Sequence, residues 1–311
     1  MTPRFERVAV LGLGLLGGSV GLAVKSRGVA ACVAGATRRR DVLEAALQCG
    51  AIDEAGSFDE AVAGADLVVL ATPVFAMAEV VRAVAPRLRE GALLTDVGSV
   101  KVKLAETLPG LLPRGVLYVG AHPMAGSHQR GLEHARADLF DGAPCIVSGA
   151  SDARARDRVC GFWRALGARV LLRDPAAHDA EVAWMSHVPH VLAFAFARAL
   201  AEAPAGAHEV AGSGFQDFTR IAQSDPELWG DILTSNRKAI VAPLQAVAES
   251  LADLGRAVDA GDADAVERWI VEARAALSLS ARGVRSPHSG ERDPNPQPER
   301  LGRGRSSINR E

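Results

Sequence analysis

The chain has 311 residues, more than a single hydrophobic core usually holds, so two domains are expected. Hydrophobic residues make up 48% and charged residues 23%, and the formal net charge is −2, which gives no general attraction for nucleic acid or anionic membranes. The four cysteines show no metal-ligand spacing. We therefore expect reduced thiols in a cytoplasmic protein, with no metal, nucleic acid or membrane as partner.

Residues 1–174 alternate short apolar runs with helix-like segments, a rhythm typical of a parallel sheet covered by helices on both faces. We expect an α/β domain with a doubly wound, mostly parallel sheet. The expected strands are 7–14, 32–37, 66–73, 92–99, 117–123, 144–150 and 169–174, and the intervening helices are 17–27, 41–49, 75–89 and 154–166.

Residues 175–284 have helical periodicity and predict a second, all-helical domain. Asp174 before Pro175 is a helix-start signal, and Pro189 interrupts the first helical run. The last residues, 285–311, carry four prolines among charged and small polar residues, so this tail is expected to be disordered.

The stretch "VAVLGLGLLGGSVG" places three glycines in a GxGxxG spacing between the first expected strand and the first expected helix. Gly12 permits a tight turn, Gly14 lets the backbone approach a pyrophosphate, and Gly17 allows close helix–strand packing. The backbone N–H groups of Leu15 and Leu16 can face the anion. The pattern predicts a dinucleotide-binding turn; the alternatives are a purely structural glycine turn or a signal peptide, for which the run holds too many glycines.

The end of the second expected strand bears on which dinucleotide binds. An NAD site usually has an acidic residue here, but the sequence reads "VAGATRRRD". Thr37 and Arg38 can bind a 2′-phosphate, which a carboxylate would repel. NADP is therefore favoured and NAD is the alternative, since the arginine run can also be a solvated surface.

Two later strand ends should face the same crevice, because ligands bind at the carboxyl ends of strands in open parallel sheets. "ATPV" contributes Thr72 and Pro73, and "TDVGSVK" contributes Asp96 and Ser99. We expect Thr72, Pro73 and Asp96 to contact the cofactor; the alternative is that they are ordinary loop residues.

His122 lies at the end of an expected strand, in the stretch "VGAHPMAGSHQRG". A dehydrogenase that oxidises a hydroxyl needs a group to accept its proton, and histidine titrates in the neutral range. A metal site is a poorer interpretation, because His122, His128 and His134 recur every six residues without an accompanying ligand set. The sequence thus favours a general base.

Five blocks of the sequence, in this order, resemble the prephenate and arogenate dehydrogenases of tyrosine biosynthesis. The blocks are "VLGLGLLGGSVG", "TDVGSVK", "GAHPMAGSHQRGLEHARADLF", "DPAAHDAEVAWMSHVPH" and "GSGFQDFTRIAQSDPELWGDI", and the likeness runs from about residue 7 to about 280. The resemblance implies a Rossmann-like domain and a helical domain that forms a homodimer. It also implies oxidation of a cyclohexadienyl substrate by NAD(P)+, with loss of the ring carboxylate as CO2.

The resemblance also assigns roles to residues. His122 accepts the proton of the ring hydroxyl, and Ser99 assists there and near the nicotinamide. His187 and Ser127 would contact the substrate, and Arg220 would clamp a substrate carboxylate. The chemistry of the residue agrees for Arg220, since a guanidinium binds a carboxylate bidentately.

Several alternatives stay open for these residues. Arg220 could instead form a surface salt bridge, and His187 could be a satisfied helix histidine. Many relatives have Thr-Glu where this chain has Ser127 and His128, so a gating role for that glutamate is unsupported and His128 is more readily a surface loop residue.

Two other functions compete with this interpretation. A β-hydroxyacid dehydrogenase would normally use a lysine on the first long helix of its second domain, but residues 176–203 contain none. A non-catalytic dinucleotide sensor would need the glycine turn, but not His122, Ser99 and Arg220 together. The sequence does not distinguish prephenate from arogenate as the substrate.

Overall fold

The computed structural model describes residues 4–126, 129–149 and 152–282. The chain divides into two compact units, Met1–Val247 and Ala248–Glu311. The change from alternating strands and helices to helices alone lies at Asp174, inside the first unit. The proposed domains 1–174 and 175–284 are therefore defined by secondary structure, and the proposed tail 285–311 lies outside the described residues.

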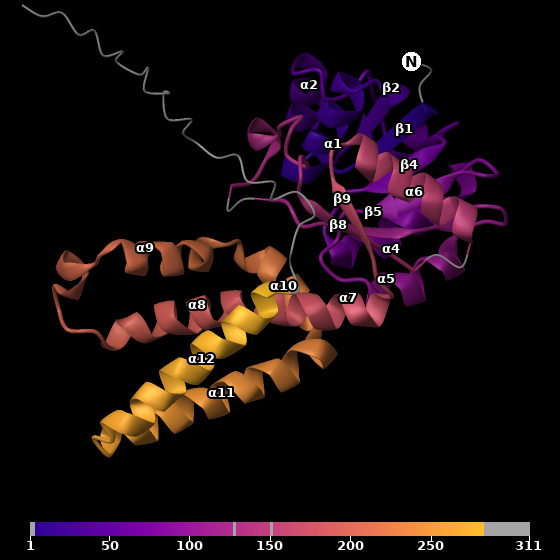
Figure 1. The fold of residues 1–311 in the computed structure, drawn as a ribbon. Coiled ribbons are helices and arrows are strands. Elements are labelled where there is room, and N and C mark those ends of the chain that lie inside the picture. The colour runs from indigo at the N-terminus through magenta and orange to yellow at the C-terminus, as the bar shows by residue number, and fades with distance from the viewer. Residues whose placement is uncertain (1–3, 127–128, 150–151, 283–311) are drawn as a thin grey trace, which may run out of the picture. The chain divides into compact units, whose positions relative to one another are not determined.

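A six-stranded parallel sheet with the order β3-β2-β1-β4-β5-β6 forms the centre of the first unit (Figure 1). Its short strand β3 lies at an edge and was not expected from the sequence, because two residues make no apolar run. The strands are β1 (Phe5–Leu11), β2 (Ala30–Ala36), β3 (Glu54–Ala55), β4 (Leu67–Leu70), β5 (Leu93–Asp96) and β6 (Leu117–Tyr118).

Helices cover both faces of this sheet, as the alternation of side chains along the strands requires. Val8 and Val10 of β1 pack into the core on one face, while Ala9 and Leu11 pack into the core on the other. The first core includes α1 (Leu15–Ser26), α2 (Arg40–Gln48) and α6 (Ala153–Ala165); the second includes α3 (Phe58–Val62), α4 (Val74–Val84) and α5 (Val102–Thr107).

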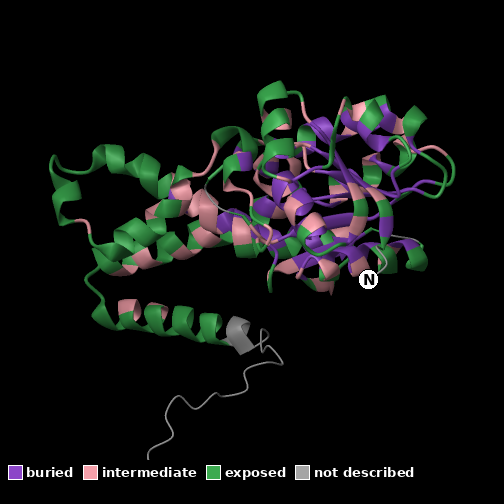
Figure 2. Cartoon of the chain, turned by 90° about the horizontal axis from the view of Figure 1, so that it is seen from above, coloured by how far each residue is buried: buried purple, intermediate pink, exposed green. Residues whose placement is uncertain are grey.

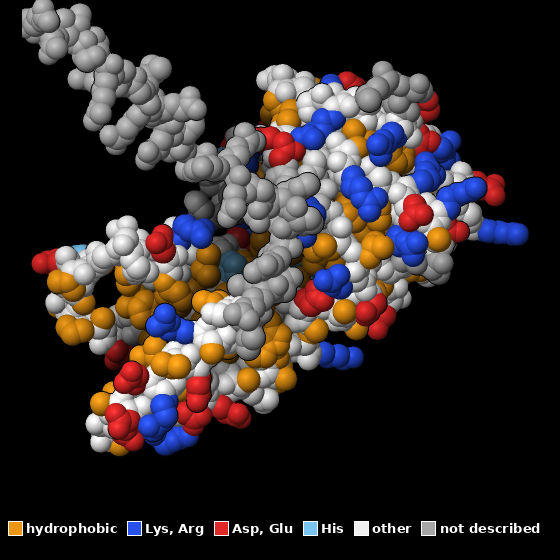
Figure 3. All heavy atoms as spheres, in the orientation of Figure 1, with side chains coloured by type: hydrophobic (Ala, Val, Ile, Leu, Met, Phe, Trp, Pro, Cys, Tyr) orange, Lys and Arg blue, Asp and Glu red, His pale blue; other side chains and the backbone are white. Residues whose placement is uncertain are grey.

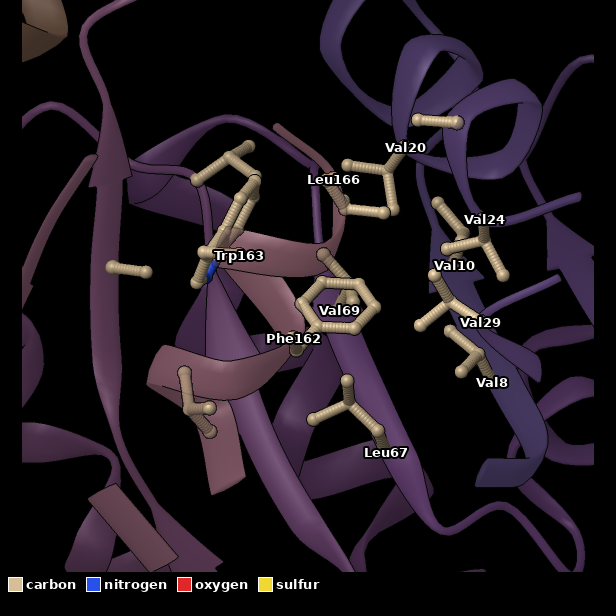
Figure 4. Close-up of a cluster of buried hydrophobic side chains, with 14 of the residues drawn as sticks. Val8, Val10, Val20, Val24, Val29, Leu67, Val69, Phe162, Trp163 and Leu166 are labelled. Carbon is tan, nitrogen blue, oxygen red and sulfur yellow. The ribbon is translucent and has the colours of Figure 1, made fainter. Parts of the chain in front are cut away.

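Close packing holds α6 against the sheet and α1 (Figure 4). Phe162 and Trp163 are fully buried, and the Phe162 ring points toward the valines of β1 and α1. Burial of one such side chain contributes about 1.5–3 kcal/mol relative to its exposed state. The doubly wound, Rossmann-like arrangement predicted from the sequence is confirmed.

A second, three-stranded sheet carries His122. It has the order β7-β8-β9, with β7 antiparallel to β8 and β8 parallel to β9. The expected strand 117–123 is in fact shared between the sheets: β6 pairs with β5, Val119 still donates to the carbonyl of Leu94 (2.9 Å), and the next residues pair with β8. The strands are β7 (Gly120–Pro123), β8 (Pro144–Ser148) and β9 (Arg169–Leu172).

Helices alone follow Asp174, whose carboxylate caps the first of them by accepting N–H groups of Ala176 and Ala177. Many residues of these helices are exposed (Figure 2). The helices are α7 (Pro175–Val182), α8 (Val188–Ala199), α9 (Ser213–Arg220), α10 (Pro226–Ser235), α11 (Arg237–Asp259) and α12 (Ala263–Arg282). The boundary between the two compact units falls within α11.

A π-helical turn, Ala183–His187, joins α7 to α8 just before Pro189. Proline offers no N–H to the helix, and its ring crowds the carbonyl four residues earlier, so the backbone widens there. The interruption expected at Pro189 thus takes the form of a wide turn, and that turn ends on His187.

Cys145 and Cys160 are buried free thiols, Cys32 is partly buried and Cys49 is exposed. Among the residues that the structure describes, no group of His, Cys, Asp and Glu side chains is arranged to hold a metal ion. Nor does any helix in the described ranges have the length and apolarity to cross a membrane.

Candidate active site

Two of the three motif glycines are required by steric contact. Gly12 has φ of +101°, and a Cβ there would lie 2.6 Å from the carbonyl oxygen of Ala71. A Cβ at Gly17 would lie 1.8 Å from the carbonyl oxygen of Gly12. Any side chain at either position would therefore force β1, β4 and α1 apart.

Gly14 differs, because nothing lies within 4 Å of the position its Cβ would take. The first helical hydrogen bond of α1 runs from Gly18 N–H to Gly14 O (2.8 Å), so the N–H groups of Leu15 and Leu16 precede it without helical partners. No described side chain caps this end. Open space and free donors at a helix N-terminus fit a pyrophosphate, and residues 12–17 would hold it.

Thr72 and Pro73 follow β4 at the same edge of the sheet. The hydroxyl oxygen of Thr72 is buried and has no hydrogen-bond partner among the described residues. A buried polar atom without a partner is costly, which makes Thr72 available to a bound group. Pro73 is exposed and caps α4.

The arginine run after β2 contains one unpaired member. Arg39 pairs with Asp41 and Arg40 pairs with Glu44, whereas exposed Arg38 forms no ion pair with any described residue. Its guanidinium is therefore free to bind an anionic group beyond Thr37, which is half-buried at the end of β2.

Asp96 is fully buried and organises the loop after β5. Its Oδ1 accepts the hydroxyl of Tyr118 (2.9 Å) and the N–H of Ala121 (3.0 Å). Its Oδ2 accepts the N–H of Gly98 (2.9 Å) and the Nζ of Lys101 (2.5 Å). The Lys101 side chain is also fully buried, and its remaining donors bind the carbonyls of residues 98 and 100.

These contacts change the role we infer for Asp96. Both oxygens are occupied by interior donors, so Asp96 would act through the backbone rather than by touching a cofactor. It binds the residue before half-buried Ser99 and the residue before His122. One carboxylate thus fixes the two segments from which the predicted catalytic side chains come.

His122 is the end of a chain of buried polar groups. Its Nδ1 lies 2.9 Å from Nε2 of His178, and Nδ1 of His178 lies 2.7 Å from Oδ1 of Asp179. Asp179 also accepts the N–H groups of Lys101 (2.7 Å) and Val102 (3.0 Å) at the start of α5. The relay therefore links β7, the start of α5 and α7.

The charge of Asp179 sets the protons along the relay. Burial by itself would raise the pKa of Asp179, but hydrogen bonds from His178 and from the two backbone N–H groups leave this pKa below its usual value. The carboxylate then accepts a hydrogen bond from the Nδ1–H group of His178, whose Nε2 in turn accepts one from the Nδ1–H group of His122. Nε2 of His122 keeps its lone pair, and no described residue hydrogen-bonds to it.

The surroundings of His122 also keep its ring neutral at neutral pH. Burial, and then the positive fields of His178, Lys101 and His187, hold the pKa of His122 well below the ordinary 6.5. The ring is thus in the form that can accept a proton.

A second histidine, His187, lies at the end of the π-helical turn and is also buried. Its ring meets Trp229 edge to face at 6.0 Å, and its Nδ1 lies 3.1 Å from Nδ2 of Asn236. Burial lowers the pKa of His187 to about 4. Protonation of His187 would lower the pKa of His122, so the two rings lie within electrostatic range of each other.

Arg220 ends α9 and is exposed, with no ion pair among the described residues. Its charge helps to lower the pKa of His190, after the larger effect of burial. His190 stacks on Trp229 at 3.9 Å, and Trp229 in turn contacts His187. The structure therefore places an unpaired guanidinium near the aromatic group that surrounds His187, while Ser127 and His128 lie outside the described residues.

The sequence pattern did not single out His178, Asp179 or Asn236, and it placed Lys101 at the strand end that faces the crevice without giving it a role. The adjacent His-Asp pair in "DPAAHDAEV" and the lysine of "TDVGSVK" were visible signals, since charged groups are rarely buried unless they are paired. Nothing in the local sequence marks Asn236.

The buried histidines predict that acid destabilises the protein. Folding lowers the pKa values of four histidines, namely His122, His178, His187 and His190. Below about pH 6.5 the unfolded chain therefore binds more protons than the folded chain, and the free energy of unfolding decreases as the pH is lowered. His187 alone, with a pKa lowered to about 4, should contribute a loss on the order of 3 kcal/mol once fully titrated. We expect a lower Tm at about pH 5 than at about pH 7.5; an equal or higher Tm in acid would contradict the burial of neutral histidines.

Family models and solved structures agree on the relatives of this chain. Residues 20–172 match the family model "Prephenate dehydrogenase, nucleotide-binding domain" and residues 174–272 match "Prephenate dehydrogenase, dimerization domain". The cyclohexadienyl dehydrogenase of Zymomonas mobilis is 31% identical over 283 residues, which cover 88% of this chain and 96% of that protein.

Two solved structures share the fold over most of their length. The prephenate dehydrogenase of Aquifex aeolicus, in complex with hydroxyphenyl propionate and NAD+, has a TM-score of 0.81 at 28% identity and covers 90% of this chain and 98% of its own. Synechocystis arogenate dehydrogenase has a TM-score of 0.75 at 28% identity, covering 88% and 99%.

Proposed function

The chain belongs to the prephenate dehydrogenase family, and on that premise we propose that it oxidises and decarboxylates prephenate, arogenate or both, in tyrosine biosynthesis. The product from prephenate is 4-hydroxyphenylpyruvate, and the product from arogenate is tyrosine. One observation carries the proposal: the relay from Asp179 through His178 leaves a lone pair on Nε2 of buried His122, in a chain that also has a dinucleotide-binding turn.

The chemistry follows from that lone pair. The ring hydroxyl donates its hydrogen bond to Nε2 of His122, which takes the proton as the carbinol C–H bond breaks. The nicotinamide dinucleotide, when bound, supplies the acceptor for the hydride. The bond from the ring to its carboxylate then breaks and CO2 leaves. The electron pair of that bond completes the aromatic ring, and the phenolic oxygen regains a proton from His122.

The other site residues would bind and orient the substrate. Arg220 is proposed to hold a substrate carboxylate, since its guanidinium has no carboxylate partner of its own among the described residues. Ser99 is proposed to assist at the ring hydroxyl, on the loop that Asp96 anchors. His187, and Ser127 from outside the described residues, complete the proposed pocket.

We propose NADP as the preferred cofactor, with NAD as the alternative. Unpaired Arg38, next to Thr37, supports this choice, because β2 ends without the acidic residue that would hold a ribose 2′-hydroxyl.

Arg38→Asp is expected to lower kcat/KM for NADP+ by roughly 10- to 100-fold, the value of one charge-assisted contact, and to spare or raise kcat/KM for NAD+. Arg40→Asp is the matched control, since Arg40 already pairs with Glu44, and it should leave the ratio of the two values unchanged. Equal losses with both cofactors in Arg38→Asp would show that this arginine does not bind the phosphate.

We also propose a homodimer formed through the helical segment. Its match to a dimerization domain supports this, as do its exposed apolar side chains. In Figure 3 hydrophobic side chains gather where Figure 1 draws α8 and α9. Among the residues from Pro175 to Val247, the exposed apolar side chains include Trp184, Met185, Phe196, Leu200, Val210 and Phe218.

The rival enzyme class finds less support. A β-hydroxyacid dehydrogenase would have a lysine on the first long helix of its second domain. In this chain α7 and α8 form that part, and neither contains a lysine. A dinucleotide sensor without chemistry would have no use for a buried relay that ends in a free lone pair.

A four-way assay tests the proposed function. Each substrate, prephenate or arogenate, is combined with each cofactor, NAD+ or NADP+, and the reduced cofactor formed is measured together with the CO2 released. We expect both products in equal amounts for at least one pair. No turnover with any pair would refute the proposal.

A further inference from the structure

Asn236 occupies the break between α10 and α11 and is only 3% exposed. Its Nδ2 lies 2.9 Å from the backbone carbonyl oxygen of Asp179 and 3.1 Å from Nδ1 of His187. Its backbone N–H donates to Ile232 and its carbonyl accepts from Ala239. The backbone of Asn236 is therefore fixed on both sides of the helix break, and its side-chain amide is held by Asp179 and His187.

The orientation of this amide follows from its partners. A backbone carbonyl only accepts hydrogen bonds, so the amide atom that faces Asp179 must be Nδ2 rather than Oδ1. Nδ2 carries two protons and no lone pair, hence Nδ1 of His187 must accept the second one. A neutral imidazole that accepts at Nδ1 carries its own proton on Nε2.

The groups around His187 keep the ring neutral. Burial is the main reason that its pKa falls to about 4; Asp179 opposes this fall, and His178 and His190 add to it. Trp229 closes one side of the ring. At neutral pH the donor at Nε2 is therefore an uncharged N–H group, and no described residue hydrogen-bonds to it.

We propose that Asn236 is a positioning residue that fixes His187 as a hydrogen-bond donor at Nε2, aimed at a carboxylate or carbonyl oxygen of the substrate. Asp179 anchors both histidines of the pocket: its carboxylate acts through His178 to leave an acceptor on His122, and its backbone carbonyl acts through Asn236 to leave a donor on His187. The identity of the acceptor rests on the proposed function; the proton position does not.

The first test is the proton position itself. Long-range ¹⁵N–¹H correlation spectra of ¹⁵N-histidine-labelled enzyme, near neutral pH and without substrate, report which ring nitrogen carries the proton. The His187 signals are assigned by their loss in His187→Gln. We expect the Nε2–H form, and an Nδ1–H form would overturn the proposal whether or not the enzyme turns over prephenate.

The second test is Asn236→Asp, which has nearly the same shape but offers an acceptor in place of a donor. Neutral His187 would then adopt the Nδ1–H tautomer, donate that N–H to the carboxylate, and have no proton left at Nε2. Only protonated His187 would keep a donor at Nε2. We expect KM for prephenate in this variant to rise about tenfold as His187 loses its extra proton with rising pH, while kcat changes little and wild-type KM stays flat.

Thr234→Asp is the control for added charge, because Thr234 is exposed and bonds only to backbone carbonyls of α10 among the described residues. Its KM should stay as flat as that of the wild type. A KM in Asn236→Asp that does not vary with pH would overturn the proposal. If that variant fails to fold, the spectra of the wild type still decide.

Discussion

His122→Asn is expected to lower kcat by about 10²-fold or more, while cofactor binding is kept. Asparagine can hydrogen-bond to the substrate hydroxyl, but its amide cannot take the proton at neutral pH. The relay of Asp179 and His178 would then end at an amide that cannot act as a base. Initial rates of cofactor reduction at saturating substrate, and cofactor affinity measured separately, check the two halves of this expectation.

His134→Asn is the matched control for that experiment. His134 lies in the short 3₁₀ turn Leu132–His134, outside the relay, and should be replaceable with little change in kcat. If His122→Asn turned over substrate at a rate close to that of the wild type, the assignment of His122 as the base would be wrong.

Arg220→Gln is expected to raise KM for prephenate by roughly 10- to 100-fold with a smaller change in kcat, because a charge-assisted contact to a carboxylate is worth about 1.5–3 kcal/mol. A carboxylate bound by Arg220 would already carry its full charge in the bound substrate, so loss of this contact should weaken binding more than chemistry. Substrate saturation curves at fixed cofactor measure both constants.

Arg198→Gln provides the same loss of charge on α8, at an exposed residue that the described contacts place in no ion pair. Its KM should match that of the wild type. If the Arg220 and Arg198 variants gave the same KM, Arg220 would not be the carboxylate clamp.

The features that the sequence predicted correctly have local causes. The glycine turn depends on steric contact at Gly12 and Gly17, and the start of α7 depends on a cap at Asp174 followed by proline. The family and the doubly wound fold are confirmed, because the motifs and the alternation of apolar runs are read directly from the sequence.

The features that were missed depend on partners distant in the sequence. Strand pairing divides the run 117–123 between two sheets, although its apolar pattern is continuous. His122 meets His178 only because β7 and α7 pack together, and Asn236 meets His187 across a helix break. Periodicity reports which face of an element is buried, but not which polar group meets it there.

The dependence of kcat/KM for prephenate on pH shows whether neutral His122 accepts the proton of the substrate. Since the pKa of His122 is held well below 6.5, the wild-type rate should stay level through neutral pH and fall only in acid, as Nε2 becomes protonated. In His122→Asn the residual rate should lack this acid limb. An unchanged acid limb in the variant would show that a group other than His122 accepts the proton.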